Sequence, residues 1–410
     1  MYALRAGQVF DGTDALGPGV VVVDDGRITA VTPGTASPNG ELIDLGDDVT
    51  LLPGLIDTHV HLVFDCTINA AETIQRVTDD ELDKQIRERA RAALTAGVTT
   101  MRDLGDRRFN TLPLRDELAR TLDAGPQLLC AGPPITSAKG HCWWLGGEVA
   151  ADADLAAAVA ERADRGVDAI KVMATGGEMT EGSHSHLAQF DAEQLRVVVR
   201  AAHRRGLPVA AHAHGRVGIR NALAAGVDTI EHCSFMGEQG VESDPELAQA
   251  VADSGVIVSL TVGGAPGNHP PPPPRIAALL PLLMENLRSL LATGITYTVG
   301  SDAGIAPIKP HDVLPYGASW LADLGEPPAR VLAAVTSVAA RACGVADRKG
   351  SLRPGHDADL LVVRGDALAD VRALHDVLAV YRAGVPVAGP RHSPPGPTLA
   401  ETLAMLRQPG

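Results

Sequence analysis

The sequence predicts an α/β protein, with a (β/α)8 TIM barrel and a small composite β-sandwich domain formed by both chain ends. Helix-like stretches rich in Ala, Arg, Glu and Leu, such as 81–96, 151–166, 191–206 and 280–293, separate most of a series of strand-like runs. The eight runs are β-branched or apolar, as is typical of buried parallel strands, and lie near 52–61, 98–103, 127–132, 168–173, 208–213, 228–232, 256–261 and 295–302. In a barrel of this kind the chemistry lies in the loops that follow the strands.

The two chain ends predict the second domain. Residues 1–50 contain strand-like segments, and similar segments return near the other end of the chain at 358–363 and 377–387. Because edge strands need partners, we expect the two ends to join in one β-sandwich. The predicted division is 1–50 and 346–390 for the sandwich, 51–345 for the barrel, and 391–410 for a tail with a helix-like segment at 398–406.

Composition excludes several classes of partner. The net charge of −15 argues against nucleic acid or an anionic membrane surface as a partner. No apolar run reaches transmembrane length, and the first five residues lack a signal-peptide core. The five cysteines form no close pair, which indicates a reducing compartment. We therefore expect a cytoplasmic protein, and the apolar tail segment favours a homo-oligomer.

Polar residues at the ends of the strand-like runs predict a metal site. His59 and His61 share one face of the first strand, as alternate strand residues do, and two adjacent imidazoles can hold a metal ion. Each also has a structural alternative, such as a hydrogen-bonded loop histidine, but several on successive strand ends are jointly improbable. The residues that follow later strands are Lys171, His212, His232 and Asp302. His214 could replace His212 as a ligand, but we expect it to lie behind the ligands or to face the substrate.

These residues stand in five motifs. The motifs are PGLIDTHVH at 53–61, IKVMATGG at 170–177, HAHG at 212–215, IEH at 230–232 and GSDAG at 300–304. In them, over residues 1 to about 390, the chain resembles the binuclear-metal branch of the amidohydrolase superfamily. Within that superfamily it is most similar to Xaa-Pro dipeptidases and arginine carboxypeptidases, with imidazolonepropionases as more distant relatives.

The resemblance implies a centre with two divalent metal ions, for which zinc is the usual occupant. One ion would be held by His59, His61 and Asp302, and the other by His212 and His232. Lys171 would be carboxylated by CO2 to a carbamate that bridges the two ions. This modification would turn the buried ammonium into an anion, so the strand would no longer have to bury the positive charge of a lysine.

The implied function is metal-dependent hydrolysis of an amide bond, most of all a peptide bond. A hydroxide that bridges the metals would attack the carbonyl, while Asp302 would accept its proton and pass it to the leaving nitrogen. His141 would donate a hydrogen bond to the substrate carbonyl oxygen, although a plain loop histidine is the alternative. Other hydrolases of this shape act on cyclic amides, carbamates, ureas or esters, and a peptidase that trims a precursor peptide is another alternative. A mononuclear deaminase or imidazolone-type ring hydrolase and a non-catalytic binding protein are the remaining alternatives.

Further residues are candidates for contact with a small-molecule or peptide substrate. Trp144, beside Trp143, would form an apolar wall or pack in the core. Arg102 could hold a substrate carboxylate, or pair with Asp103, Asp106 or a group behind a ligand.

Two other segments fall in loops of the predicted barrel. His184 and His186 follow the fourth strand and are expected in a mobile substrate loop rather than in a third metal site. The proline run at 270–274 is expected to be a stiff segment of the seventh loop that narrows the mouth of the pocket.

Overall fold

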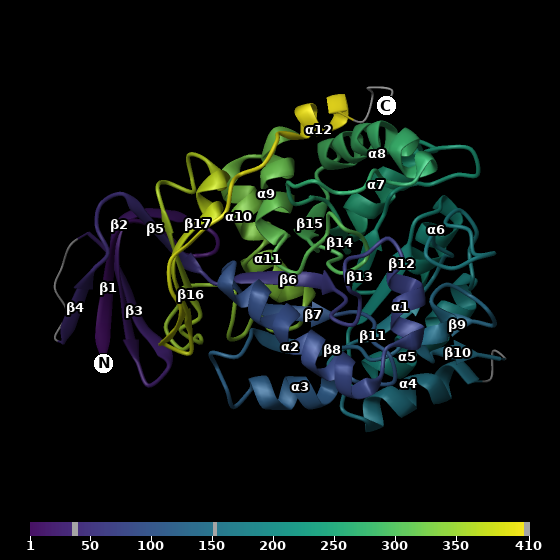
Figure 1. The fold of residues 1–410 in the computed structure, drawn as a ribbon, viewed down its shortest axis with the longest axis horizontal. Helices are drawn as coiled ribbons and strands as arrows, with labels where there is room; N and C mark the ends of the chain where they lie inside the picture. The colour runs from purple at the N-terminus through teal and green to yellow at the C-terminus, as the bar shows by residue number, and fades with distance from the viewer. Residues whose placement is uncertain (35–39, 151–153, 406–410) are drawn as a thin grey trace.

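The protein was analysed as a computed structural model, which describes residues 1–34, 40–150 and 154–405. Its centre is a TIM-barrel-like arrangement of parallel strands in two sheets (Figure 1). One sheet contains β6 (Leu55–Val60), β7 (Val98–Asp103) and β8 (Gln127–Cys130). The other contains β11 (Ile170–Met173), β12 (Val209–Ala213), β13 (Thr229–His232), β14 (Ile257–Leu260) and β15 (Thr296–Val299). Parallel bridges between Val60 and Ala303 and between Ile135 and Val172 link the two sheets at both edges.

Helices follow most of these strands and cover them. They are α1 (Ala70–Arg76), α2 (Asp79–Thr95), α3 (Thr111–Leu118), α4 (Leu155–Asp164), α5 (Ala192–His203), α6 (Arg216–Ala225), α7 (Pro245–Ser254), α8 (Pro274–Ala292), α9 (Leu314–Asp323), α10 (Pro328–Ala334) and α11 (Ser337–Ala342). The start of α5 follows local chemistry, because Asp191 and Gln194 form a capping box there. The predicted helices at 81–96, 191–206 and 280–293 are confirmed within a few residues. The start of the predicted 151–166 helix lies outside the described residues.

Both chain ends contribute to a single, mostly antiparallel sheet of nine strands. The N-terminal strands are β1 (Tyr2–Phe10), β2 (Ala15–Asp24), β3 (Arg27–Pro33), β4 (Glu41–Asp44) and β5 (Val49–Pro53). The C-terminal strands are β16 (Leu360–Arg364), β17 (Asp376–Arg382), β18 (Val385–Ala388) and β19 (Arg391–His392). The two sets meet where β5 pairs with β16, with Leu52 opposite Leu361. This nine-stranded sheet lies beside the parallel strands (Figure 1).

The run at 52–61, predicted as one strand, is two strands. β5 belongs to the nine-stranded sheet and β6 to the parallel strands, and the chain crosses between them at Gly54. A Cβ atom at Gly54 would lie 2.2 Å from Thr99 Oγ1, so only glycine fits at this crossing. Both strands are buried and the residues around the crossing, 51–56, are apolar or glycine, so the sequence pattern hides the boundary.

The remaining surface and tail complete the fold. The tail helix α12 (Leu399–Met405) forms near the predicted 398–406, with the Leu399 N–H donating to Asp323 on α9.

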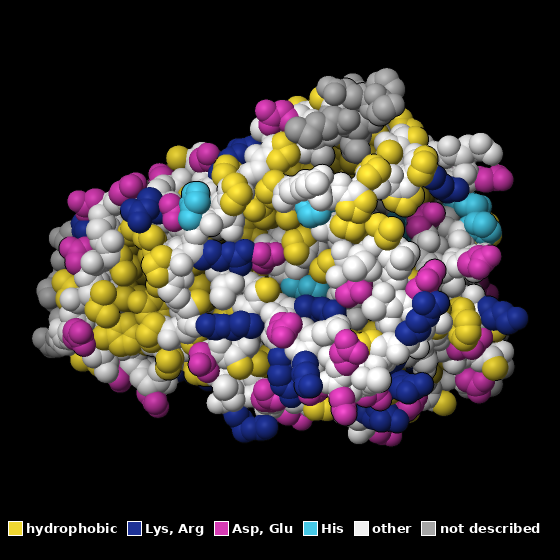
Figure 2. Space-filling view, in the orientation of Figure 1, with side chains coloured by type: hydrophobic (Ala, Val, Ile, Leu, Met, Phe, Trp, Pro, Cys, Tyr) yellow, Lys and Arg dark blue, Asp and Glu magenta, His cyan; other side chains and the backbone are white. Residues whose placement is uncertain are grey.

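No helix among the described residues is long and apolar enough to cross a bilayer. Over the parallel-strand region, the face in Figure 2 shows basic and acidic side chains interspersed rather than separated by sign.

Candidate metal centre

The first group of candidate ligands joins the ends of β6 and β15. His59 Nε2 lies 3.3 Å from His61 Nε2. Asp302 Oδ1 lies 3.6 Å from His59 Nε2 and 3.4 Å from His61 Nε2. All three side chains are buried. Residues about 240 positions apart in the chain thus bring two imidazoles and a carboxylate to one point, as the strand-end prediction required.

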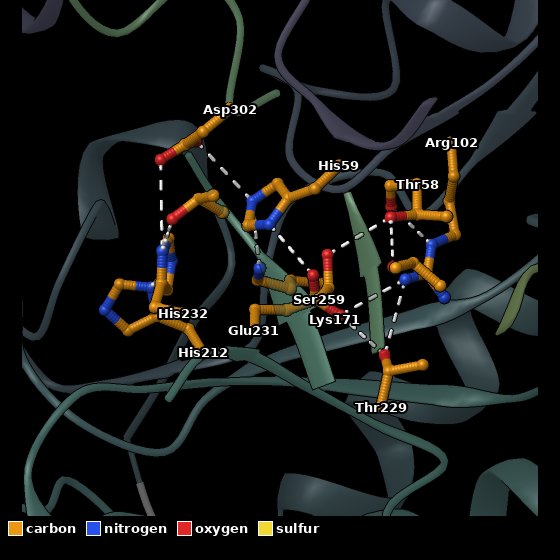
Figure 3. Close-up of polar contacts among 12 residues, drawn as sticks. Thr58, His59, Arg102, Lys171, His212, Thr229, Glu231, His232, Ser259 and Asp302 are labelled. Atoms are coloured by element: carbon orange, nitrogen blue, oxygen red, sulfur yellow. Dashed lines mark hydrogen bonds and ion pairs between the residues drawn. The ribbon is translucent and has the colours of Figure 1, made fainter. Parts of the chain in front are cut away.

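The second group lies at the ends of β12 and β13. His232 Nε2 lies 2.9 Å from His212 Nδ1. His214 is close enough to form one group with them, with its ring stacked on that of His232 at a centroid distance of 4.3 Å. The Asp302 carboxylate connects the two groups, since its Oδ2 lies 4.0 Å from His232 Nδ1 (Figure 3).

Lys171, on β11, lies between these groups and is almost completely buried. Its Nζ lies 3.4 Å from His59 Nε2. That imidazole is the only hydrogen-bonding contact of the ammonium within the described part of the chain. Burial lowers the pKa of Lys171 to about 8, against the opposing charges of Glu231 and Asp302.

Backbone carbonyls determine which nitrogen of two imidazoles carries the proton. His61 Nδ1 lies 3.0 Å from the Gly105 carbonyl oxygen, and His212 Nε2 lies 3.0 Å from the Gly176 carbonyl oxygen. Because a carbonyl only accepts hydrogen bonds, both of these nitrogens are protonated. The lone pairs are therefore on His61 Nε2 and His212 Nδ1, the atoms that face the other candidate ligands.

Side chains contact the outer nitrogens of the other two imidazoles, where a hydroxyl can donate or accept and so orients a ring without deciding which nitrogen carries the proton. His232 Nδ1 lies 2.8 Å from Thr261 Oγ1. His59 Nδ1 lies 2.9 Å from Glu231 Oε2, as a close contact without the alignment of a hydrogen bond. Burial lowers the pKa of His59 to about 4 and those of His212 and His232 well below the usual range. These rings are therefore neutral at pH 7, the state in which imidazole binds metals.

The donor set fits divalent cations. His232 Nε2 and His212 Nδ1 approach to 2.9 Å, and His59 Nε2 and His61 Nε2 to 3.3 Å. Each pair sets a lone pair, on His212 Nδ1 or His61 Nε2, against a nitrogen of a second imidazole, so a cation bound between the two rings would have two nitrogen ligands within reach. Nitrogen and carboxylate ligands of this kind suit zinc and neighbouring metals.

Glu231, on β13, lies in the IEH motif at 230–232, and its role becomes visible only in the folded protein. It is completely buried, and its Oε1 accepts hydrogen bonds from Arg102 at 3.1 Å and from Thr229 Oγ1 at 2.5 Å. Burial favours a raised pKa, but the charges of Arg102, His59 and Lys171 outweigh it and lower the pKa of Glu231. The sequence pattern that could have identified Glu231 is the same as for Lys171, a charged residue within a buried strand.

The prediction that Arg102 holds a substrate carboxylate is wrong. Its guanidinium is buried and donates to the carbonyl oxygens of Thr58 at 2.8 Å and Ala342 at 2.9 Å, as well as to Glu231 (Figure 3). Its donors are therefore used within the protein. The structure instead shows the second alternative, in which Arg102 pairs with a group behind a ligand. That group is Glu231, which lies against His59.

His141 and Trp144 reach the centre from the loop after β8. The His141 ring is buried with its centroid 4.9 Å from that of His212. A Cβ at Gly177 would lie 2.5 Å from His141 Nε2, so this glycine makes room for the ring. The Trp144 ring lies 5.9 Å from the Phe64 ring, and the Phe64 ring lies 5.2 Å from the His61 ring. Phe64 therefore connects Trp144 to the centre.

His184 and His186 lie in the segment between β11 and α5, outside both candidate ligand groups. Their rings are 5.7 Å apart. Backbone bonds from Gly176 to the Leu187 carbonyl and from Gly215 to the Ser185 carbonyl, both 3.0 Å, tie this segment to the barrel. The proline run at 270–274 ends at the first residue of α8, a position that suits proline.

Comparisons with known proteins agree with this geometry. Ochratoxinase from Aspergillus niger is 26% identical over 384 residues, covering 84% of this chain and 77% of ochratoxinase. Imidazolonepropionase from Saccharopolyspora erythraea is 24% identical over 418 residues, covering 93% of this chain and 94% of that protein. The structure of a Xaa-Pro dipeptidase with methionine bound in its active site superposes with a TM-score of 0.82 and 27% identity, covering 94% of this chain and 99% of the dipeptidase.

The model of the amidohydrolase family matches residues 50–387, which is well over half of the chain. The matched range includes every candidate ligand. This protein belongs to the amidohydrolase family.

Proposed function

We propose that this protein is a binuclear metal-dependent hydrolase of amide bonds, most of all peptide bonds. His59, His61 and Asp302 would hold one divalent cation, and His212 and His232 the other, with zinc as the usual metal for such ligands. The observation that carries the proposal is the convergence of four imidazole rings, with nitrogen pairs 2.9 and 3.3 Å apart, beside one carboxylate in a buried site.

We also propose that Lys171 is carboxylated by CO2. Addition of CO2 forms an N–C bond and releases a proton, and only the neutral amine can react. The lowered pKa of about 8 supports this step, because it raises the neutral fraction near pH 7. The resulting anion would be placed between two cations, which removes the cost of burying an unpaired ammonium.

The residues of the chain would then divide the chemistry among them. Bound cations would supply an acidified water and a Lewis acid for the scissile carbonyl. Burial favours a raised pKa for Asp302, but the neighbouring His59, His61 and Lys309 lower it, so the side chain begins as a carboxylate. Asp302 can therefore accept a proton at Oδ and deliver it to the leaving nitrogen.

His141, His214 and Trp144 are proposed substrate contacts. Burial lowers the pKa of His141 to about 3, so its ring is neutral, and its Nδ1 has no partner among the described residues. A neutral ring of this kind can donate one hydrogen bond to the substrate carbonyl oxygen. His214 Nδ1 lies 2.7 Å from Ser234 Oγ, and its place beside His232 suits contact with substrate or replacement of His212 as a ligand.

Metal analysis tests the centre first. We expect two metal ions per chain after reconstitution with zinc and bicarbonate, and a carbamate signal in ¹³C NMR after reconstitution with ¹³C-bicarbonate. One tightly held ion and no carbamate would contradict the proposal and favour a mononuclear deaminase or imidazolone-type hydrolase.

A substrate screen tests the reaction. The metal-loaded protein would be incubated with dipeptides and N-acyl amino acids, and in parallel with cyclic amides, carbamates, ureas and esters. The structural similarity to a Xaa-Pro dipeptidase supports a dipeptide substrate. Hydrolysis restricted to the second set would overturn the peptide assignment while leaving the metal centre intact.

The finer organisation is proposed on the same basis. We propose a (β/α)8 barrel over 51–345, a β-sandwich from 1–50 and 346–390, and a tail from 391 onward, supported by the order of the strands in the two kinds of sheet. Five free cysteines, four of them buried, support a cytoplasmic location. A homo-oligomer without nucleic-acid or membrane partners completes the proposal.

A further inference from the structure

Lys309 is a second buried lysine near the centre. It lies in the segment after β15 with a side chain only 7% exposed. Its Nζ donates to the Ser301 carbonyl oxygen at 2.9 Å and to the Thr261 carbonyl oxygen at 3.0 Å. Thr261 follows β14 and Ser301 follows β15, so one ammonium joins the loops of two neighbouring strands.

The first of these bonds holds the peptide that precedes Asp302. Asp302 has a φ of 54°, in the left-handed region that residues with a side chain rarely adopt. Such a conformation persists only where the surroundings hold it in place. The residue before the bend is fixed at both of its peptide groups, by the Ser301 N–H, which donates to Asp57 at 2.9 Å, and by the Ser301 carbonyl, which accepts from Lys309.

The second bond holds the residue that orients His232. Thr261 Oγ1 lies 2.8 Å from His232 Nδ1, while the carbonyl of the same threonine accepts from Lys309. His232 also has a left-handed φ, of 71°. Displacement of Thr261 would therefore remove the hydrogen-bond partner that sets the direction of this ring.

We propose that Lys309 is a positioning residue that couples the two halves of the metal centre. This inference rests on the proposed function, since Asp302 and His232 belong to different cation sites there. Through Ser301 it places the carboxylate of the first site, and through Thr261 it places an imidazole of the second. An ammonium suits the task because one nitrogen offers several N–H donors to carbonyls that converge from two loops.

Three variants test the coupling with the protein loaded with Co²⁺. Lys309→Met keeps the length of the side chain and removes its donors, and Lys309→Arg restores a cation. Thr261→Val removes only the hydroxyl that faces His232. We expect Lys309→Met to change the visible absorption of both cobalt ions and to weaken both, in chelator competition, by roughly 10- to 100-fold. Thr261→Val should affect one ion, and Lys309→Arg should recover part of the loss.

Arg330→Met is the matched control. Arg330 donates to the Ile295 carbonyl at 2.8 Å, just before the opposite end of β15, so it is also a cation that holds a backbone oxygen. We expect this variant to lower the melting temperature without changing the cobalt spectrum. With a confirmed substrate, Lys309→Met should lower kcat more than it changes KM, because it displaces the catalytic groups rather than the binding surface.

The outcomes separate this inference from the proposed function. A Lys309→Met protein with wild-type cobalt affinity and spectrum, but a lowered melting temperature, would show that Lys309 is merely structural. A change confined to one cobalt ion would overturn the coupling. A wild-type protein that takes up no cobalt would overturn the proposed function and the inference together.

Discussion

The nine-stranded sheet and the metal centre each bury a lysine and an aspartate, but they treat the charges differently. In the sheet region, Lys349 Nζ lies 3.0 Å from Asp357 and also donates to Asp359. In the centre, Lys171 is buried at least as deeply, yet its only hydrogen-bonding contact among the described residues is an imidazole nitrogen of His59 at 3.4 Å. The sheet neutralises its buried charge within the protein, whereas the centre does not.

The difference indicates what each region requires. A buried charge is tolerated when a partner of opposite sign and hydrogen bonds satisfy it. Lys349 meets this condition, so its group is complete as it stands. The centre instead combines an amine without a carboxylate partner in hydrogen-bonding contact with four imidazoles that converge on one another, and under the proposed function it becomes complete only with cations and a modified lysine. Substitutions of matching residues in the two regions should therefore have opposite consequences.

The largest effect is expected for the two buried aspartates. Asp302→Asn should lower kcat by about 10²- to 10⁴-fold or more, because an amide cannot accept the proton and is a poorer ligand. Asp359→Asn should leave kcat unchanged and lower the free energy of unfolding, because Asp359 accepts from Lys349 and from the Ala383 N–H at 2.8 Å. Steady-state kinetics and denaturant titration of both variants measure the contrast. Full activity of Asp302→Asn would remove the proton-transfer role.

The two buried lysines should differ next. Lys349→Met leaves the buried Asp359 carboxylate without its cation, while Asp357 keeps Arg27 and Arg348, and should cost roughly 3–5 kcal/mol of unfolding free energy, with metal content unchanged. Lys171→Met should lower metal content below two ions per chain and abolish turnover. The metal-free Lys171→Met protein should be as stable as metal-free wild type, since an unpaired buried amine is replaced by an apolar side chain. Metal analysis and denaturant titration measure both; a large loss of stability for metal-free Lys171→Met would contradict the comparison.

Glu231 tests whether the ion pair behind the centre resembles the one in the sheet. Glu231→Gln keeps the shape of the side chain but removes the charge that faces Arg102 and His59. We expect metal affinity to fall by about 10- to 100-fold, as is usual for groups that orient a ligand. Chelator competition measures this effect. If Glu231→Gln instead keeps the wild-type metal affinity and lowers the free energy of unfolding, Glu231 is a structural residue, as Lys349 is.

The sequence predicted the parallel strands and the candidate ligands for the same reason. Polar residues such as His212 and Asp302 interrupt apolar runs at strand ends, and the fold brings those ends together. The sequence left two alternatives open for Arg102, because its position on a strand does not reveal that Thr58, Ala342 and Glu231 use its donors. Lys309 was missed because it lies in a loop without periodicity, where only the folded backbone shows which carbonyls converge.

The smallest expected effect concerns the pH dependence of the sheet region. Burial favours a raised pKa for Asp357, but Lys349, Arg27 and Arg348 outweigh it and lower the pKa below its ordinary value of 3.8. A carboxylate with a lowered pKa in the folded state stabilises the fold above about pH 4, and this contribution is lost as the pH falls through the folded pKa. Asp357→Asn should therefore be less stable than wild type near pH 6, and the difference should shrink as the pH falls below about 4. Denaturant titrations across this range measure the difference, and a constant gap would attribute it to packing rather than to charge. Metal content at pH 7 should be the same in both proteins, because the ion pairs of the sheet region are complete without the centre.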